Sequence, residues 1–236
     1  STSVSAIVLS IICLAVAPVL SASLIAALHR PLARLGLVDT PNERKRHDAA
    51  VPLAGGPAIV VAFALLLLAS GDWSSQYAGL LAAMFVLCAM GIADDRYGMR
   101  ASLKFAIQIG IALLLIYGDD LAVHHLGAIT GGARVELNGW QVPFTILCIV
   151  GLINAINMLD GLDGLAGGVV GVILAALAGV AVIGGAPAAA VGPVLLLGVL
   201  VEYLCYNYPG LRGRRPRIFM GDSGSLTLGI AIAWFA

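Results

Sequence analysis

Long apolar runs, separated by short polar loops, occupy most of the sequence. They lie near residues 4–28, 52–70, 77–93, 103–117, 143–159, 169–186 and 188–206, with an eighth that begins at 225. A helix needs about 17 to 25 apolar residues to cross a bilayer core of about 30 Å. Only 11% of the residues are charged, against about 25% in an average soluble domain. We therefore predict an all-α polytopic membrane protein with about eight transmembrane helices.

The first and last apolar runs lead to two further predictions. The first apolar run has no basic segment before it, which favours a membrane span over a signal peptide. The last run, residues 225–236, would rise only about 18 Å as a helix and could not cross the bilayer. We therefore expect residues 1–236 to form a single transmembrane domain that is incomplete at its C-terminal end.

The basic residues predict how the spans are oriented. Twelve of the thirteen Lys and Arg residues fall in loops that alternating spans place on one side. They are Arg30, Arg34, Arg44, Lys45, Arg46, Arg96, Arg100, Lys104, Arg212, Arg214, Arg215 and Arg217. Because cytoplasmic loops are rich in Lys and Arg, this side is predicted to be cytoplasmic and the N-terminus to be outside. In the outer loop, the alternation over 133–137 followed by Asn138-Gly139 predicts a small β-hairpin.

The first polar motif is "GIADDRYGMR", in which Asp94 and Asp95 end an apolar span. Adjacent carboxylates repel each other, and a cation or a nearby Arg would relieve that repulsion. The pair is therefore a candidate for binding a divalent cation or for acting as a base. The alternative is a span end whose acids are merely solvated at the interface.

The second motif, "GLINAINMLDGLDGLAGG", covers residues 151–168. On a helix, Asn154 and Asn157 share one face, as do Asp160 and Asp163. The glycines that follow predict that the helix breaks near Asp160. Non-helical backbone at membrane depth must be buried in protein or line a wet cavity, so this break is a candidate binding site. A polar helix end with tight glycine packing is the alternative.

The third motif is "RIFMGDSGS", which places Asp222 just before the last apolar run. An acid at the start of a helix can be an ordinary cap, and the basic run upstream of it can be a topology anchor or can hold an anionic ligand.

The fourth motif is "LVDTPNERKRHDAAVPLAGG", a polar loop before the second span. Its candidate binding residues are Asp39, Asn42, Lys45, Arg46 and His47; a solvated cytoplasmic loop is the alternative reading. All four motifs fall on the predicted cytoplasmic side. Acids crowded beside basic residues at span ends suggest a site for a metal ion and phosphate.

Taken in order, the four motifs resemble the polyprenyl-phosphate N-acetylhexosamine-1-phosphate transferases. The resembling segments are "LVDTPNERKRH…P…GG", "DDRYGMRASLKFAIQ", "NAINMLDGLDGLAGG" and "FMGDSGS". The first segment is more similar to the branch that uses UDP-N-acetylglucosamine or related sugars than to the branch that uses UDP-MurNAc-pentapeptide. Members of the family continue beyond the position of Ala236 with further spans and a His-rich cytoplasmic loop.

The resemblance implies a reaction. Such an enzyme moves a sugar-1-phosphate from a UDP-N-acetylhexosamine to undecaprenyl phosphate at the bacterial inner membrane and releases UMP, which begins cell-envelope glycan synthesis (cell wall or O-antigen lipopolysaccharide). The metal ion would be Mg²⁺, with Mn²⁺ as the alternative. The resemblance implies no nucleic-acid partner and is compatible with a homodimer.

The resemblance also implies roles for individual residues. Asp222 would be the main metal ligand, and Asp94 and Asp95 would bind the metal or deprotonate the lipid phosphate. Asn157, Asp160 and Asp163 would shape the nucleotide side of the site, and His47 with its basic neighbours would contact anionic substrate.

Two other classes of function stay open on the residues alone. An ion-coupled transporter can also contain broken helices and intramembrane acids, but it would place the acids near mid-membrane and often shows inverted repeats. A structural scaffold would leave the glycine and acid motifs unexplained.

Overall fold

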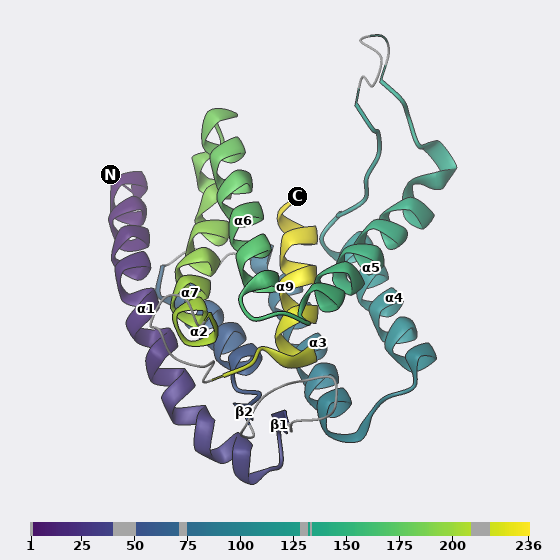
Figure 1. The fold of residues 1–236 in the computed structure, drawn as a ribbon. Coiled ribbons are helices and arrows are strands. Elements are labelled where there is room, and N and C mark those ends of the chain that lie inside the picture. The colour runs from purple at the N-terminus through teal and green to yellow at the C-terminus, as the bar shows by residue number, and fades with distance from the viewer. Residues whose placement is uncertain (1, 40–50, 71–74, 128–131, 133, 209–217) are drawn as a thin grey trace.

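The computed structural model describes residues 2–39, 51–70, 75–127, 132, 134–208 and 218–236. Over these ranges the chain is almost entirely helical, which confirms the all-α prediction (Figure 1). The α-helices are α1 (Thr2–Arg34), α2 (Gly55–Ala69), α3 (Ala78–Tyr97), α4 (Ala101–Gly118), α5 (Gln141–Leu159), α6 (Leu165–Ile183), α7 (Val191–Asn207) and α9 (Gly221–Phe235). The short elements are β1 (Val38–Asp39), β2 (Val51–Pro52) and the 3-10 turns η1 (Ser75–Tyr77), η2 (Asn138–Trp140) and η3 (Pro187–Ala190).

Six of the described helices are long and apolar enough to cross a membrane, so the protein is a polytopic membrane protein. These six are α1, α3, α4, α5, α6 and α7. The other two, α2 and α9, have 15 residues each, which corresponds to about 22 Å of helix against a core of about 30 Å. The expected eight spans are therefore matched by eight helices at the expected places, of which six have the length and composition of a full crossing.

The helix α9 lies inside the bundle rather than at its lipid-facing surface. Every residue from Ser223 to Ile232 is buried, and α9 packs against α3, α5, α2 and α6. Figure 1 shows it, in yellow, among the other helices. A helix that is buried all round belongs to the core of a bundle, so α9 holds whatever its first turn carries in a fixed position.

Small residues allow this close packing. A Cβ added at Gly91 of α3 would overlap the backbone of Ser223, and one added at Gly56 of α2 would overlap the backbone of Gly224. A Cβ at Gly229 would lie 2.6 Å from the Cα of Ile153 in α5. Gly and Ser at helix interfaces let backbones approach in membranes, where packing and hydrogen bonding drive association. The sequence "GDSGSLTLG" thus places α9 in backbone contact with three other helices.

At one end of the bundle, three chain segments meet through backbone hydrogen bonds. The strands β1 and β2 pair antiparallel, with Val38 opposite Pro52. The N–H of Phe219 donates to the carbonyl of Pro52 (3.1 Å), and the N–H of Gly55 donates to the carbonyl of Phe219 (3.0 Å). The segment before α9 is therefore hydrogen-bonded to β2 and to the start of α2. This end carries the motifs that were predicted to share one side.

The outer loop differs from the predicted hairpin. Leu126 and Val135 pair through the hydrogen bond from Leu126 N–H to Val135 O (2.9 Å), and the isolated bridge joins His125 and Glu136. The segment 135–137 therefore pairs with the segment before it through hydrogen bonds and one isolated bridge, without forming a strand. Asn138-Gly139 does not form the hairpin turn, because it belongs to the 3-10 turn η2 that leads into α5. The predicted hairpin was therefore wrong in its turn and in its partner segment.

A tryptophan links α9 to α4 at the end of the bundle opposite to β1 and β2. Nε1 of Trp234 donates a hydrogen bond to Oδ2 of Asp119 (3.0 Å), which directly follows α4. Trp234 also packs against the ring of Tyr77, with ring centroids 5.3 Å apart. Aromatic and polar contacts therefore fix the second end of α9.

The packing of α9 against α5 predicts the effect of a single methyl group. Gly229→Ala should lower the melting temperature in detergent, because overpacking a core costs about 1–3 kcal/mol and the added Cβ meets backbone that cannot rotate away. Gly179→Ala in α6 is the matched control, since nothing lies within 4 Å of its added Cβ. Equal melting temperatures for both variants would contradict the close approach of α9 and α5.

Candidate active site

The helix α3 ends just after two adjacent carboxylates. Oδ1 of Asp94 accepts a hydrogen bond from the N–H of Met99 (2.6 Å), and Oδ2 accepts one from Nζ of Lys104 (2.5 Å). Lys104 lies in the first turns of α4 and can return to Asp94 because Gly98, with φ of +67°, reverses the chain. Both oxygens of Asp94 are therefore engaged by protein groups.

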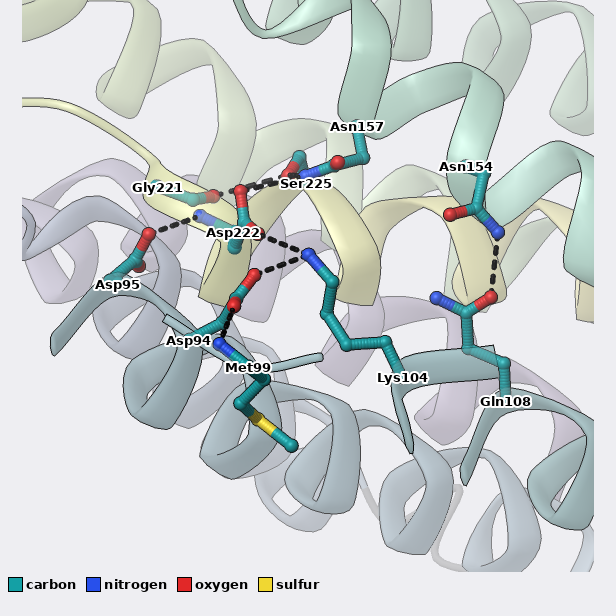
Figure 2. Close-up of polar contacts among 10 residues, drawn as sticks. All are labelled: Asp94, Asp95, Met99, Lys104, Gln108, Asn154, Asn157, Gly221, Asp222 and Ser225. Carbon is teal, nitrogen blue, oxygen red and sulfur yellow. Dashed lines mark hydrogen bonds and ion pairs between the residues drawn. The ribbon is translucent and has the colours of Figure 1, made fainter. Parts of the chain in front are cut away.

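Asp222 brings a third carboxylate to the same place from the first turn of α9. Its N–H donates to Oδ1 of Asp95 (3.2 Å), and its Oδ1 accepts from Nδ2 of Asn157 (2.9 Å). Its Oδ2 lies 3.5 Å from Nζ of Lys104. Figure 2 shows Lys104 reaching between Asp94 and Asp222. Helices α3, α4, α5 and α9 thus each contribute a polar group to one cluster.

The charges in this cluster are only partly solvated. The side chains of Asp94, Asp222 and Lys104 are 10%, 28% and 26% exposed. Asp222 lies at the start of α9, outside the six candidate spans, and burial together with the neighbouring Asp94 carboxyl raises its pKa above the usual range. The ammonium of Lys104 opposes this effect, because a nearby cation favours the charged carboxylate.

Asp94 and Asp95 have different surroundings although they are neighbours in the chain. Oδ2 of Asp95 is buried and finds no hydrogen-bond partner among the described residues. A Cβ at Gly221 would lie 2.6 Å from this oxygen, and Gly221 has φ of +67°, so a glycine is required there. Asp95 therefore keeps one oxygen uncommitted, whereas Asp94 keeps none.

The helix break predicted near Asp160 is confirmed. The helix α5 ends at Leu159, Asp160 follows it directly, and α6 begins after Gly164, which has φ of +77°. The N–H of Gly164 donates to Oδ1 of Asn207 (2.7 Å), and Nδ2 of Asn207 donates to the carbonyl of Ile218 (3.0 Å). One buried amide from α7 therefore fixes both the start of α6 and the segment that leads to α9.

A pocket of about 370 Å³ opens between these elements, within the usual range of ligand pockets. Its lining consists of Val38, Leu53, Asp95, Asn157, Met158, Asp160, Gly161, Leu162, Asp163, Asn207, Phe219, Gly221 and Asp222. Among these, Met158 and Leu162 are 83% and 68% exposed. The lining of the pocket therefore contains both carboxylates and exposed apolar side chains.

Five of the seven predicted site residues that the structure describes come together at this pocket. Its lining includes Asp95, Asn157, Asp160, Asp163 and Asp222. Asp94 is not in the lining but is linked to Asp222 through Lys104. Four of the predicted residues, Asn42, Lys45, Arg46 and His47, lie outside the described residues. The backbone of Asp39 pairs with Val51 in the sheet, next to Val38 of the pocket lining.

Asn154 does not join the pocket although it shares a helix face with Asn157. Its Nδ2 donates to Oε1 of Gln108 in α4 (2.6 Å) and to the carbonyl of Val150 (2.8 Å). The two asparagines therefore have different roles: Asn157 binds Asp222 at the pocket, and Asn154 links α5 to α4.

Two residues of the site were not predicted from the sequence, Lys104 and Asn207. Lys104 was counted only as one of the basic residues on the predicted cytoplasmic side. The available signal was its place in the helix that follows the Asp94-Asp95 pair, where an ammonium can fold back onto the acids. Asn207 offers a similar signal, since a buried amide at the end of an apolar helix requires hydrogen-bond partners.

No three His, Cys, Asp or Glu side chains in the described part of the chain form a group that could hold a metal ion by themselves. An Mg²⁺ site does not require such a group, because this ion commonly uses one or two carboxylates together with substrate phosphates. Asp94 and Asp222 already face one cation, the ammonium of Lys104. The donor chemistry therefore fits a hard divalent cation at this cluster.

The sequence defines the class of protein to which this fold and site belong. The profile of glycosyl transferase family 4 matches residues 77–236. The chain therefore belongs to this family, and the match includes every residue of the carboxylate cluster.

The chain is also similar to individual transferases of known name. The chain is 33% identical over 201 residues to a probable undecaprenyl-phosphate N-acetylglucosaminyl 1-phosphate transferase of Bacillus subtilis, covering 85% of this chain and 54% of the relative. It is 36% identical over 216 residues to the undecaprenyl-phosphate alpha-N-acetylglucosaminyl 1-phosphate transferase of Haemophilus influenzae, covering 91% and 61%. The protein of that name from Escherichia coli K12 is 31% identical over 204 residues, covering 85% and 54%. The chain thus spans somewhat more than half the length of these relatives.

The two hydrogen bonds of Asn207 predict separable effects. Asn207→Leu should lower the melting temperature and speed amide hydrogen exchange over 160–165, because each buried group left unpaired costs about 1–3 kcal/mol. Asn207→Asp keeps the acceptor for Gly164 and loses the donor to Ile218, so exchange over 160–165 should stay near wild type. Hydrogen exchange with mass spectrometry measures both. Equal exchange at 160–165 in all three proteins would contradict the role of Asn207.

Proposed function

We propose that this protein transfers an N-acetylhexosamine-1-phosphate from a UDP-sugar to undecaprenyl phosphate at the cytoplasmic face of the bacterial inner membrane. GlcNAc is the favoured sugar, because the named relatives are N-acetylglucosaminyl 1-phosphate transferases. The products are UMP and a lipid-linked diphosphosugar, which begins a cell-envelope glycan. The observation that carries the proposal is the convergence of Asp95, Asn157 and Asp222 in one pocket.

The position of the pocket suits two substrates of opposite solubility. A polyprenyl phosphate keeps its chain in the bilayer and its phosphate at the interface, whereas a UDP-sugar arrives from water. The exposed Met158 and Leu162 offer apolar contacts for the first, and the carboxylates of the lining would meet the charged groups of both through a bound cation. Because twelve of thirteen basic residues are predicted on the same side, anionic substrates are attracted to this end of the bundle.

A divalent cation would supply the charge that the phosphates require. Mg²⁺, or Mn²⁺ as the alternative, would be held by Asp222 with help from Asp94 or Asp95, and it would neutralise charge on the diphosphate. Asn157 orients Asp222 by donating to its Oδ1, which leaves Oδ2 directed toward the position that Lys104 faces. Asn157 therefore sets the direction in which Asp222 presents Oδ2.

The reaction itself is a displacement at phosphorus. An oxygen of the lipid phosphate attacks the phosphorus that carries the sugar, a new P–O bond forms, and the bond from that phosphorus to the bridging oxygen breaks so that UMP leaves. A protonated lipid phosphate must lose its proton to attack well. Asp95 is the better acceptor because it lines the pocket and has an oxygen with no hydrogen-bond partner among the described residues, whereas Lys104 and Met99 hold both oxygens of Asp94.

The remaining acids suit the nucleotide side of the pocket. Asp160 and Asp163 follow the end of α5, where the backbone is no longer helical and the loop can approach a ligand. The first polar loop, with Asn42, Lys45, Arg46 and His47, is proposed to contact anionic substrate, and Asp39 lies at its start. These assignments rest on the resemblance of the motifs and on the pocket that the neighbouring residues line.

An ion-coupled transporter is the less favoured function. The carboxylates of the cluster lie at the ends of α3 and α5 and at the start of α9, not at mid-height where such a site is expected. Membership of a glycosyl transferase family also favours group transfer over transport.

The direct test is a transfer assay with the full-length protein in membranes. Undecaprenyl phosphate and Mg²⁺ are incubated with UDP-GlcNAc, UDP-GalNAc or UDP-glucose, and the lipid products and UMP are measured by mass spectrometry. Transfer from UDP-GlcNAc is expected. Asp222→Asn should reduce it by about 10²–10³, the size of effect seen when a charge-stabilising group is removed. Asp120→Asn, at an exposed position at the opposite end of the bundle, is the matched control and should stay near wild type. The absence of lipid product with any UDP-sugar would overturn the proposal.

Asp94 and Asp95 should behave differently in this assay. If Asp95 accepts the proton, wild-type kcat/KM falls at low pH because the carboxylate becomes protonated, and Asp95→Asn should be slow at every pH without that fall. Asp94→Asn should retain the fall at low pH, with a lower rate because Lys104 loses one of its two carboxylate partners. Identical pH profiles for the two variants would contradict the assignment of the proton to Asp95.

A further inference from the structure

Lys104 occupies a position that a metal ion would be expected to take. Its Nζ lies 2.5 Å from Oδ2 of Asp94 and 3.5 Å from Oδ2 of Asp222. The two carboxylates come from different helices, α3 and α9, and the ammonium comes from a third, α4 (Figure 2). The contact therefore joins three helices through a single positive charge.

The two carboxylates need a positive charge to stay together. Both are largely shielded from water, at 10% and 28% exposure, and like charges in such surroundings repel strongly. Asp222 cannot move away, because its backbone N–H is bound by Asp95 and its Oδ1 by Asn157. Asp94 is held in the same way by Met99. The pair is thus built in advance for a cation.

A lysine is well suited to hold such a position temporarily. Its charge sits at the end of a flexible four-carbon stem with three rotatable donors. An Mg²⁺ ion bound at 2.0–2.1 Å from the same oxygens would leave no room for the ammonium and would repel it. The two cations therefore exclude each other at Oδ2 of Asp94 and Oδ2 of Asp222.

We infer that Lys104 is a built-in substitute for the divalent cation: it neutralises Asp94 and Asp222 while no metal ion is bound, and it moves aside when Mg²⁺ takes its place. On release, its ammonium becomes available to the diphosphate of the donor substrate. The inference rests on the proposed function for the choice of Mg²⁺. The competing explanation is a permanent ion pair that holds α4 against α3 and α9 while a metal binds elsewhere.

Labelling of individual lysines can follow Lys104, because residues 1–236 contain only one other lysine, Lys45. The full-length wild-type protein in detergent is treated with an amine-acylating reagent in EDTA or in Mg²⁺ alone, and modification of each lysine is quantified by mass spectrometry. Lys104 should be protected in EDTA, and Mg²⁺ should speed its modification several-fold relative to Lys45. Equal rates for Lys104 in both conditions would overturn the inference.

Two variants of Lys104 test the exchange through the affinity of the protein for Mg²⁺. Charges within about 4–6 Å change binding of a proton by about 10- to 1,000-fold, so Lys104→Met should raise the affinity for Mg²⁺ by at least about tenfold, measured by calorimetry without substrates. Its melting temperature should fall in EDTA and recover in Mg²⁺. Lys104→Arg, which keeps the charge, should stay stable in EDTA. An unchanged Mg²⁺ affinity in Lys104→Met would overturn the inference.

The outcomes separate this inference from the proposed function. Neither labelling nor calorimetry uses a UDP-sugar or a lipid, so a protein without transfer activity can still show Mg²⁺-dependent release of Lys104. Conversely, active transfer with constant labelling of Lys104 would remove the inference and leave the proposed function in place. If Lys104→Met does not fold in either condition, the labelling of the wild-type protein decides alone.

Discussion

The site depends on one helix that is buried along nearly its whole length. From Ser223 to Ile232, α9 is enclosed by the other helices, and glycines at 56, 91 and 229 allow backbone to meet backbone. Asp222 lies in the first turn of this helix, so the packing of α9 against its neighbours fixes the position of the Asp222 carboxylate. A helix at the lipid-facing surface could tilt or shift with the membrane, whereas α9 cannot do so without opening its contacts with α2, α3 and α5.

The polar cluster shows how a membrane protein keeps charges close together at the edge of its apolar core. Asp94 and Asp222 are neutralised by Lys104, and backbone N–H groups or the amide of Asn157 hold the remaining oxygens in place. The exception is Oδ2 of Asp95, which is buried and has no hydrogen-bond partner in the part of the chain that the structure describes. Buried groups of this kind are rare because they are costly, and here the uncommitted oxygen belongs to a residue that lines the pocket.

Local features of the sequence predicted much of this arrangement. The helix order follows from the length of the apolar runs, and the break after Leu159 follows from the glycines around Asp160 and Asp163. The contacts that depend on chain reversal were not predictable in the same way. Lys104 joins the site because Gly98 turns α4 back toward α3, and Asn207 has partners 43 and 11 residues away. The outer Asn138-Gly139 misled the prediction, because the short 3-10 turn into α5 overrode the usual hairpin preference of this dipeptide.

The exposed side chains of Met158 and Leu162 give the pocket an apolar lining that suits a ligand held in the bilayer. A molecule with a long apolar chain would then arrive by diffusing in the plane of the membrane, in two dimensions. Its effective concentration is a surface density, set by the amount of carrier per area of bilayer and unaffected by the volume of the surrounding solution. Adding inert lipid would dilute such a ligand at this pocket, whereas the concentration of a water-soluble ligand there would not change.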